Sequence, residues 1–232
     1  MNIEFLTKGQ QCKQESISAK DCFNALTPDQ KTLVENSTTL LQFAKGETII
    51  KQGYVASHIL FLEKGITKVD VSNDSKISTV GLLGSGSFIG LPCSFACKSF
   101  DFSAVALEEA SIRMINMDVF QSLLKENGEF ALKLVRHMSL STSMMLHRTC
   151  RISGKNVEGS LAFILQELSE IYASSSFTLP VTRIGLASLA GCSKESVINS
   201  LTRFHNDGII EIVDKKVSIL KPDLLDLIVK NG

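Results

Sequence analysis

The sequence predicts an α+β fold: a β-rich N-terminal half, one long helix and a C-terminal winged helix-turn-helix. Three observations predict it. Short apolar runs separated by glycines fill residues 40–117, residues 118–152 contain no proline, and residues 181–220 hold two short helical segments around a glycine turn followed by a hairpin pattern. A change from strand-like to helix-like periodicity along one chain is typical of segregated β and α segments.

The N-terminal half is expected to be a sandwich or barrel, because it has many short strands at near-regular spacing and no intervening helical patterns. A helix is expected just before it, with Thr27 as N-cap and Pro28 in the first helical position. The strand candidates are residues 49–50, 59–62, 69–71, 80–83, 104–107 and 112–115.

The composition is that of a globular chain: 232 residues, 44% apolar and 21% charged. This length allows one large domain or two ordinary ones. No apolar run approaches the length of a membrane span or a secretory leader, so we expect no membrane contact and a cytoplasmic protein with reduced thiols. The 24 basic and 24 acidic residues balance, so any contact with nucleic acid must depend on local charge.

Residues 118–152 are expected to form one long helix that pairs with a second copy of the chain. Apolar and hydroxyl side chains recur there at spacings of three and four, the pattern of a seam between two helices. The alternative is a long helix packed only on its own domain. The seam consists of Val135, Met138, Thr142, Met145, Thr149 and Ile152. The same stretch is basic and suggests a positive region near a phosphate backbone, through Lys133, Arg136, Arg148, Arg151 and Lys155.

Residues 182–206 have the pattern of a helix-turn-helix. Thr182 can cap a first helix, Gly191 allows a positive φ and a close approach of two helices, and Ser193 can cap a second helix. The apolar positions of the first helix are Ile184, Leu186, Leu189 and Ala190. The second helix has an inner face of Val197, Leu201 and Phe204 and an outer face of Lys194, Glu195, Asn199 and Arg203.

The outer face suits base reading in the major groove of DNA, because Lys donates to guanine, Asn pairs with adenine and Glu accepts from cytosine. Side chains at the helix N-termini can hold phosphate. After Gly208, apolar alternation on both sides of Lys215 and Lys216 predicts a hairpin with a basic tip, the wing. An αα-hairpin inside an enzyme is the alternative, but cap, turn, outer face and wing occur here in order.

The C-terminal segment resembles the DNA-binding domain of the cyclic-AMP receptor / fumarate–nitrate regulator (CRP/FNR) family of bacterial transcription factors. The matching residues from Thr182 are T-R-x-x-x-A-x-x-A-G-C-S-K-E-S-V. The N-terminal half resembles the same family's cyclic-nucleotide-binding-type β-roll (jelly roll) through F-x-K-G-E-x-I-x-x-Q-G, I-L-F-L-x-x-G-x-x-K-V and G-S-F-I-G.

The resemblance implies an allosteric homodimer that binds double-stranded DNA at an inverted repeat, with RNA polymerase as a further partner. Its base-contacting positions fall on Lys194, Glu195 and Asn199, although Asn199 stands where the family usually has arginine. Phosphate contacts are expected from Thr182, Arg183, Ser193, Ser196 and Arg203, with Lys215 and Lys216 in the wing.

The implied organisation is an effector-sensing domain with an N-terminal arm over 1–117, a dimerisation helix over 118–153 and a DNA-binding domain over 154–232. Residues 153–156 are expected to form the hinge. Gly154 can end the long helix in a left-handed cap, and Asn156 can cap the next helix.

The sensor domain departs from the cyclic-nucleotide binders of the family. Where the resemblance requires Gly-Glu and Arg-Ser, the sequence has Gly90-Leu91 and Phe102-Ser103, so both charged groups are missing. An anionic phosphate would be buried without a cation, which costs several kcal/mol. We therefore expect an effector other than cyclic AMP. The expected pocket comprises Gly90, Leu91, Phe102, Ser103, Met145 and Leu146.

Two redox alternatives remain open at this point. Cys12 and Cys22 resemble the cysteine-rich arm of the family's oxygen-sensing branch, and Cys93 and Cys97 could complete the four ligands of an iron–sulfur cluster. Glu15 stands where that branch has its middle cysteine. Haem, as in nitric oxide sensors, would use His58, His137 or His147.

Two other classes of function compete with a DNA-binding regulator: an enzyme, and a ligand-binding regulatory module that does not bind DNA. The sequence carries no Ser-His-Asp order, phosphate-cradling glycine loop or H-E-x-x-H motif. The first class is therefore not expected.

Overall fold

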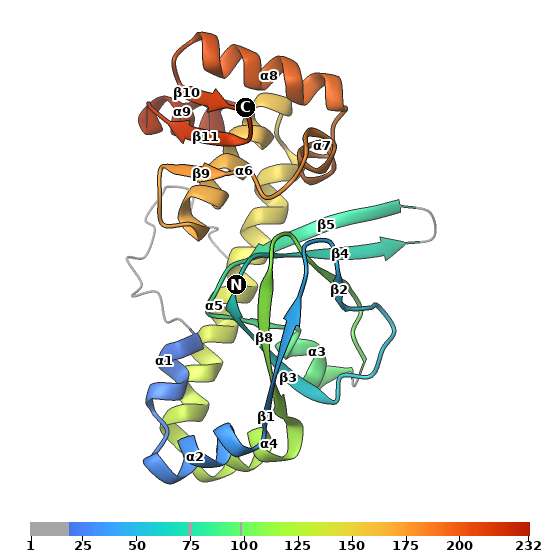
Figure 1. Cartoon of the computed structure of the whole chain (residues 1–232), viewed down its shortest axis with the longest axis vertical. Coiled ribbons are helices and arrows are strands. Elements are labelled where there is room, and N and C mark those ends of the chain that lie inside the picture. The colour runs from blue at the N-terminus through green and yellow to red at the C-terminus, as the bar shows by residue number, and fades with distance from the viewer. Residues whose placement is uncertain (1–18, 74–75, 98) are drawn as a thin grey trace, which may run out of the picture.

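The computed structural model describes residues 19–73, 76–97 and 99–232. Figure 1 shows a β-rich N-terminal part and a C-terminal part at opposite ends of the long axis, and the helix α5 (Gly128–Ser153) runs beside the first part and leads to the second. This arrangement agrees with the predicted fold class. In the described residues no helix is long and apolar enough to span a bilayer.

The N-terminal part is a sandwich of two four-stranded antiparallel sheets, ordered β1-β8-β3-β6 and β2-β7-β4-β5. Each predicted strand overlaps an observed one. The sequence did not reveal β1, β6 or the short helix α3 (Leu91–Ala96). The strands are β1 Thr38–Phe43, β2 Thr48–Ile50, β3 His58–Lys64, β4 Thr67–Asn73, β5 Lys76–Leu83, β6 Ser87–Ile89, β7 Ser103–Ala106 and β8 Ala110–Asn116.

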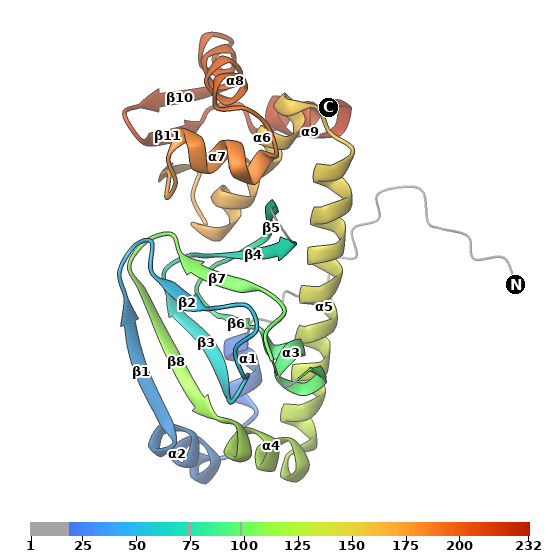
Figure 2. The ribbon, with the colours of Figure 1, turned by 90° about the vertical axis from the view of Figure 1, so that its right-hand side faces the viewer.

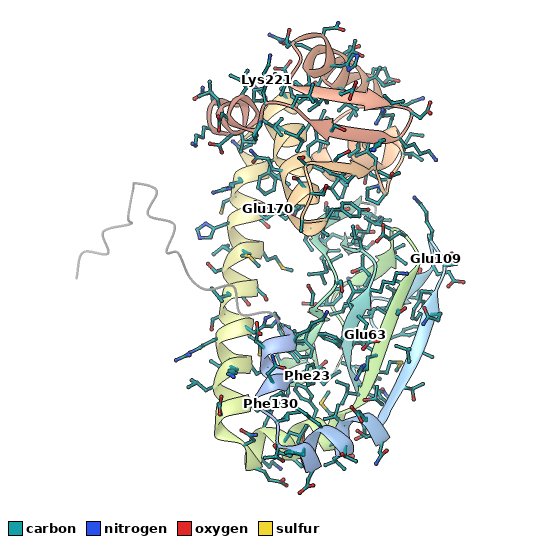
Figure 3. The ribbon with its side chains drawn as sticks, turned by 60° about the vertical axis from the view of Figure 1, so that its left-hand side comes forward. Phe23, Glu63, Glu109, Phe130, Glu170 and Lys221 are labelled. Atoms are coloured by element: carbon teal, nitrogen blue, oxygen red, sulfur yellow. The ribbon has the colours of Figure 1, made fainter. Side chains whose placement is uncertain are left out.

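Two helices precede the sandwich, α1 (Ala19–Asn24) and α2 (Pro28–Asn36). Thr27 caps α2 as predicted, and Gln30 completes a capping box with it. An aromatic cluster packs α1 and α5 against the sheets. Phe23 and Phe130 meet there at 6.2 Å between ring centroids (Figure 3), and Phe120 and Phe130 are fully buried.

The predicted single helix over 118–152 is wrong: the chain forms α4 (Met117–Glu126) and then α5, with a break at Asn127. The Asn127 side chain accepts a hydrogen bond from the Phe130 N–H at 3.0 Å and so caps α5. Its amide also donates to the Ala25 carbonyl and to Gln30 at 2.9 and 2.8 Å. These bonds to the N-terminal helices fix the break.

The hydrophobic core of the C-terminal part extends into the neighbouring end of the sandwich. Ile66, Leu82 and Leu107 of the sandwich belong to the same apolar cluster as the buried residues of the C-terminal helices. Asn156 caps α6 as predicted, but Gly154 has φ −101°, so the predicted left-handed cap is wrong. The elements are α6 Val157–Ile171, β9 Ser176–Thr178, α7 Arg183–Ala190, α8 Lys194–Asn206, β10 Ile210–Val213, β11 Lys216–Ile219 and α9 Pro222–Asn231.

Candidate nucleic-acid interface and sensor domain

The helix-turn-helix forms as predicted, from α7 and α8. The Thr182 hydroxyl accepts the Gly185 N–H at 3.2 Å, and the Ser193 hydroxyl accepts the Ser196 N–H at 3.1 Å. Gly191 joins the helices with φ +66°. A Cβ at Gly191 would meet nothing within 4 Å. Glycine is therefore needed for its backbone conformation, and the predicted close approach of helices at this position is wrong.

The inner face of α8 is buried as predicted: Val197, Leu201 and Phe204 are at most 2% exposed. On α7, Ile184 is 66% exposed, so its predicted place among the apolar contacts is wrong. The outer face of α8 is exposed to solvent, through Lys194, Glu195, Asn199 and Arg203. Figure 2 shows α8 at the end of the molecule away from the sandwich, where a DNA duplex could approach it.

The cap at Ser193 gives a stability prediction. Replacing Ser193 by Ala leaves an N-terminal N–H of α8 without its partner and should lower the free energy of unfolding by about 1 kcal/mol. Ser188→Ala, on the exposed side of α7, is the matched control and should change stability by less than about 0.5 kcal/mol. Chemical denaturation measures both. Equal effects of the two substitutions would contradict the capping role.

The candidate phosphate contacts differ in how accessible they are. Arg183 is half-buried, and burial lowers its pKa. Arg203 is exposed but already pairs with Glu158 at 2.9 Å and with Asp207 at 3.9 Å. Exposed pairs of this kind contribute at most about 1 kcal/mol, so a phosphate can compete for the guanidinium.

The wing forms as a three-stranded sheet ordered β10-β11-β9. Asp214 sits in the turn with φ +55°, and Lys215 and Lys216 are exposed beside it. The strand β9 was not predicted. It ties the wing to the domain core, because Val217 of β11 pairs with Phe177 of β9.

Contacts within the chain engage part of the basic run that begins on α5. Arg148 is buried against Glu167, and Lys133 pairs with Glu129 at 3.0 Å. Lys155 donates to the Val229 carbonyl, and the Arg151 guanidinium lies 5.9 Å from the centre of the Phe163 ring. Arg148 is therefore not available to a phosphate. Lys133 and Arg151 keep at least partly exposed side chains, so a phosphate-facing role for the rest of the run stays a prediction.

The predicted dimer seam divides between two faces of α5. Met138 packs against the chain's own N-terminal core, and Ile152 is half-buried. Met145 approaches β5, 3.7 Å from a Cβ built at Gly81, but is still 40% exposed. Solvent reaches the neighbouring face more fully. We call it the exposed stripe of α5: Leu132, Val135, Thr142, Leu146 and Thr149.

The expected effector pocket is filled by the chain's own aromatic rings. Leu91 and Phe102 are buried, and Gly90 has φ +72°. A Cβ at Gly90 would lie 2.6 Å from the Phe100 ring and 3.0 Å from the Phe102 ring. The Ser103 hydroxyl accepts the Gln52 N–H at 3.1 Å, and Leu146 is 64% exposed on α5. Leu146 therefore does not line this interior within one protomer.

The packing at Gly90 is consistent with an effector other than a cyclic nucleotide, which stays a prediction. Phe102 stands where the resemblance requires an arginine, and the rings of Phe100 and Phe102, 5.8 Å apart, pack over Gly90.

The candidate cluster ligands are dispersed. Cys12 lies outside the described residues. Cys22 is buried on α1, whereas Cys93 and Cys97 lie at α3. Within the described ranges no three His, Cys, Asp or Glu side chains gather as metal ligands. Burial raises the pKa of Cys22 and of Cys93 to about 11, helped by Asp21 and Asp101 respectively, which favours the protonated thiol over the thiolate that a metal binds.

The candidate haem ligands lie in unrelated places. His137 packs edge-on against Phe88 at 5.6 Å, and His147 is exposed. His58 borders an apolar cavity of about 170 Å³ between the two sheets. That volume is below the 300–1,000 Å³ typical of small-molecule sites.

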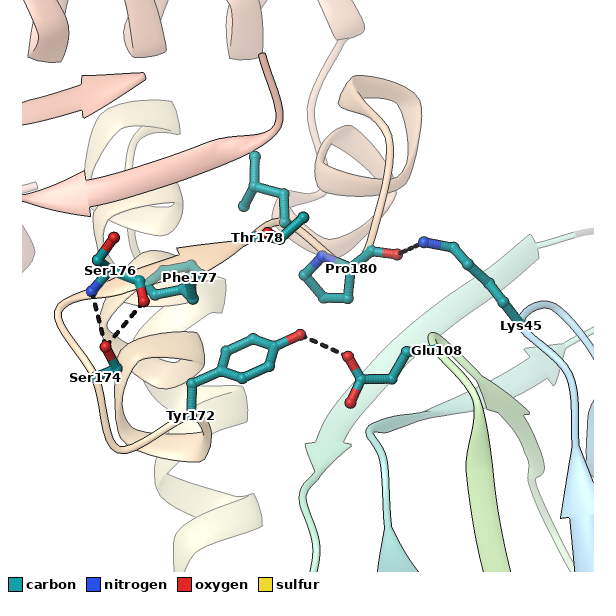
Figure 4. Close-up of a pocket in the computed structure, with 9 residues that line it drawn as sticks. Lys45, Glu108, Tyr172, Ser174, Ser176, Phe177, Thr178 and Pro180 are labelled. Atoms are coloured by element: carbon teal, nitrogen blue, oxygen red, sulfur yellow. Dashed lines mark hydrogen bonds between the residues drawn. The ribbon is translucent and has the colours of Figure 1, made fainter. Parts of the chain in front are cut away.

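The sequence did not predict the contacts between the sandwich and the C-terminal part. A pocket of about 380 Å³ lies there. In Figure 4, Lys45 and Glu108 of the sandwich face Pro180 and Tyr172 of the C-terminal part. The Tyr172 hydroxyl donates to Glu108 at 2.8 Å, and Lys45 donates to the Pro180 carbonyl. Burial and the Glu108 carboxylate raise the pKa of Tyr172, so the phenol stays a donor.

Comparisons with known proteins agree with this division. Residues 40–127 match the cyclic nucleotide-binding domain, and residues 160–228 match the Crp-like helix-turn-helix domain. The transcriptional activator protein FnrA of Stutzerimonas stutzeri is 25% identical over 182 residues, covering 76% of this chain and 74% of that protein. The nitrogen fixation regulation protein FixK of Bradyrhizobium diazoefficiens is 21% identical over 220 residues, covering 92% of each.

The same architecture occurs in a solved structure. FixK2 from Bradyrhizobium japonicum superposes with a TM-score of 0.74 at 17% identity, covering 82% of this chain and 96% of that one. A sensor-type β-roll joined by a long helix to a winged helix-turn-helix defines a DNA-binding transcriptional regulator. The chain belongs to the CRP/FNR family, because it combines the two domains of that family in order. Members of this family are transcriptional regulators rather than enzymes.

Proposed function

We propose that the protein is a homodimeric regulator that binds an inverted-repeat operator and responds to an effector other than cyclic AMP. The observation that carries the proposal is the capped, exposed helix α8 beside a basic wing. Lys194, Glu195 and Asn199 would read bases in each half-site. Thr182, Arg183, Ser193, Ser196 and Arg203 would hold phosphates, with Lys215 and Lys216 reaching the backbone from the wing.

The dimer would form along α5. Its exposed stripe repeats at spacings of three, seven, four and three, which suits a two-helix seam. Val135 and Leu146 are 58% and 64% exposed in one protomer, and burying them against a partner is favourable. A two-fold axis along α5 would place two α8 helices about 34 Å apart, one turn of DNA. The proposed divisions are 1–117, 118–153 and 154–232, with dimerisation now assigned to residues from 128 onward.

The effector would bind in or near the β-roll and bias the orientation of the C-terminal domain. An iron–sulfur cluster or haem stays an alternative, and a regulatory module that does not bind DNA is the alternative from another class. The family's transcriptional role supports RNA polymerase as a partner and the cytoplasm as the location.

Cyclic AMP itself should not bind. Titration calorimetry of the purified protein with cyclic AMP should give no saturable heat, because a buried phosphate would lack a cation and would meet Phe102. Micromolar affinity would contradict this part of the proposal. Removing the aromatic block alone, with Phe102→Ala, should not create binding, whereas Phe102→Arg combined with Leu91→Glu tests whether the two missing charges are sufficient.

DNA binding is tested by selection from random duplexes followed by mobility-shift assays of the selected sites. The expected result is a two-fold symmetric consensus bound by the full chain. Failure to enrich any sequence, with all duplexes bound equally weakly, would favour the alternative of a regulatory module without specific DNA binding.

A further inference from the structure

A buried ion pair joins the proposed dimer helix to the DNA-binding domain. The Arg148 Nε on α5 donates to the Glu167 carboxylate on α6 at 2.8 Å, and their side chains are 6% and 16% exposed. Removing one partner of such a pair strands a buried charge, whereas an apolar replacement of the whole pair can be as stable. A buried pair at a domain junction is therefore weak evidence for a role in stability alone.

The same guanidinium also reaches the sensor domain. Arg148 Nη1 donates to the Thr79 carbonyl on β5 at 3.4 Å. The Thr79 hydroxyl in turn donates to Asp70 on β4 at 2.7 Å, and Asp70 pairs with Lys68. One side chain thus connects α5, α6 and the β4–β5 hairpin. We call Arg148, Glu167 and Thr79 the junction clamp.

The bonding capacity of the clamp is only partly used. Among the described residues, Arg148 Nη2 and Glu167 Oε2 are buried without a hydrogen-bond partner. Burial, helped by the Glu170 carboxylate, raises the pKa of Glu167 although Arg148 lowers it. Because hydrogen bonds depend on the angle between donor and acceptor, the bonds that Arg148 makes favour one angle of α6 on α5. A rotation that breaks them would leave further buried groups without partners, which is costly.

Other contacts also cross the junction. Ile66, Leu82 and Leu107 contribute apolar contact with the C-terminal core, and such contact is non-directional. A Cβ at Gly84 would lie 2.8 Å from Ile171, so the hairpin end and α6 are in close approach. The other polar links, Tyr172–Glu108 and Lys45–Pro180, lie around the pocket at the end of α6.

We propose that the junction clamp is a positioning element that sets the operator spacing which the dimer accepts. This inference rests on the proposed function. The clamp fixes α6 on α5, α6 carries the helix-turn-helix, and α5 carries the two-fold axis. In a two-fold dimer, any rotation of α6 on α5 therefore takes place in both protomers, and it changes the separation and tilt of the two α8 helices. The clamp makes no contribution to base reading within a half-site.

The test compares spacing preference rather than affinity. Selected operators are rebuilt with the central spacer shortened or lengthened by one and two base pairs, and binding is measured for the full-length wild type and Glu167→Gln. The wild type should lose about tenfold or more in affinity at two base pairs from its optimum, because each base pair rotates a half-site by about a tenth of a turn. Glu167→Gln should lose about threefold or less across the same series, because its domains adjust to each spacing.

The matched control is Glu170→Gln, which removes the same charge from an exposed position on the same helix. It should keep the wild-type spacing profile. Arg148→Lys is the second variant: it keeps the charge but cannot reach Glu167 and Thr79 together, so it should also flatten the profile, and it decides the matter if Glu167→Gln does not fold.

A clamp variant that keeps the wild-type ratio between optimal and altered spacers overturns the proposal, whether or not its overall affinity falls. Failure of the proposed function appears differently, because the wild type itself would then bind single half-sites as well as paired ones and show no spacing optimum.

Discussion

Replacing both Val135 and Leu146 by Glu should convert the protein to monomers. Both side chains are large, apolar and exposed on one face of α5. In a two-fold dimer the double substitution would place four carboxylates in the seam. Each like charge buried there without a partner costs several kcal/mol, so self-association should weaken by at least about 1000-fold. Sedimentation equilibrium measures this directly.

Met144→Glu is the control for this substitution. Met144 is 67% exposed on the same helix, and at 3.6 residues per turn it lies about half a turn round from Val135. It should leave the mass of the assembly unchanged. If Met144→Glu gives monomers and the double variant stays dimeric, the seam lies on another face of α5.

Glu195→Ala should relax base choice at one position in each half-site. Glu195 is exposed in the first turn of α8, where it can accept a hydrogen bond from a cytosine amino group. Losing one such contact costs about 1–3 kcal/mol of discrimination against the wrong base. Repeating the selection with the variant should give a degenerate column at that position and its symmetry mate, with the other columns unchanged.

Arg183→Ala is the companion measurement, with an opposite signature. Its guanidinium lies at the start of α7 and should hold a phosphate, so its loss should weaken all duplexes alike and lower the salt dependence of binding by about one counterion per protomer. A uniform loss of affinity from Glu195→Ala, with the consensus intact, would contradict the base-reading role.

The sequence predicted those features whose causes lie within a few residues. The caps at Thr27, Asn156, Thr182 and Ser193 each bond to a backbone N–H three residues ahead. Residues within one helical turn therefore determine the geometry of these caps. The same holds for the alternating strands of the β-roll and for the inner face of α8.

Features with distant causes could not be predicted. Asn127 caps α5 through the nearby Phe130 N–H, but its amide also bonds to Ala25 and Gln30, about 100 positions away in the sequence. Arg148 belonged to a run of basic residues, and nothing local indicated that Glu167 would bury it. Met138 fits the heptad spacing of a seam, but its side chain packs against the aromatic core beneath α5. Local pattern gives the period of a helix, whereas tertiary packing decides which face meets which neighbour.

The most direct test of the central claim is the mass of the protein–DNA complex. Native mass spectrometry of the full chain with a selected inverted repeat should show two protomers per duplex, and a duplex with one half-site scrambled should be bound at least about tenfold more weakly by the same dimer. A complex of one protomer per duplex, bound equally well with the second half-site destroyed, would contradict the account.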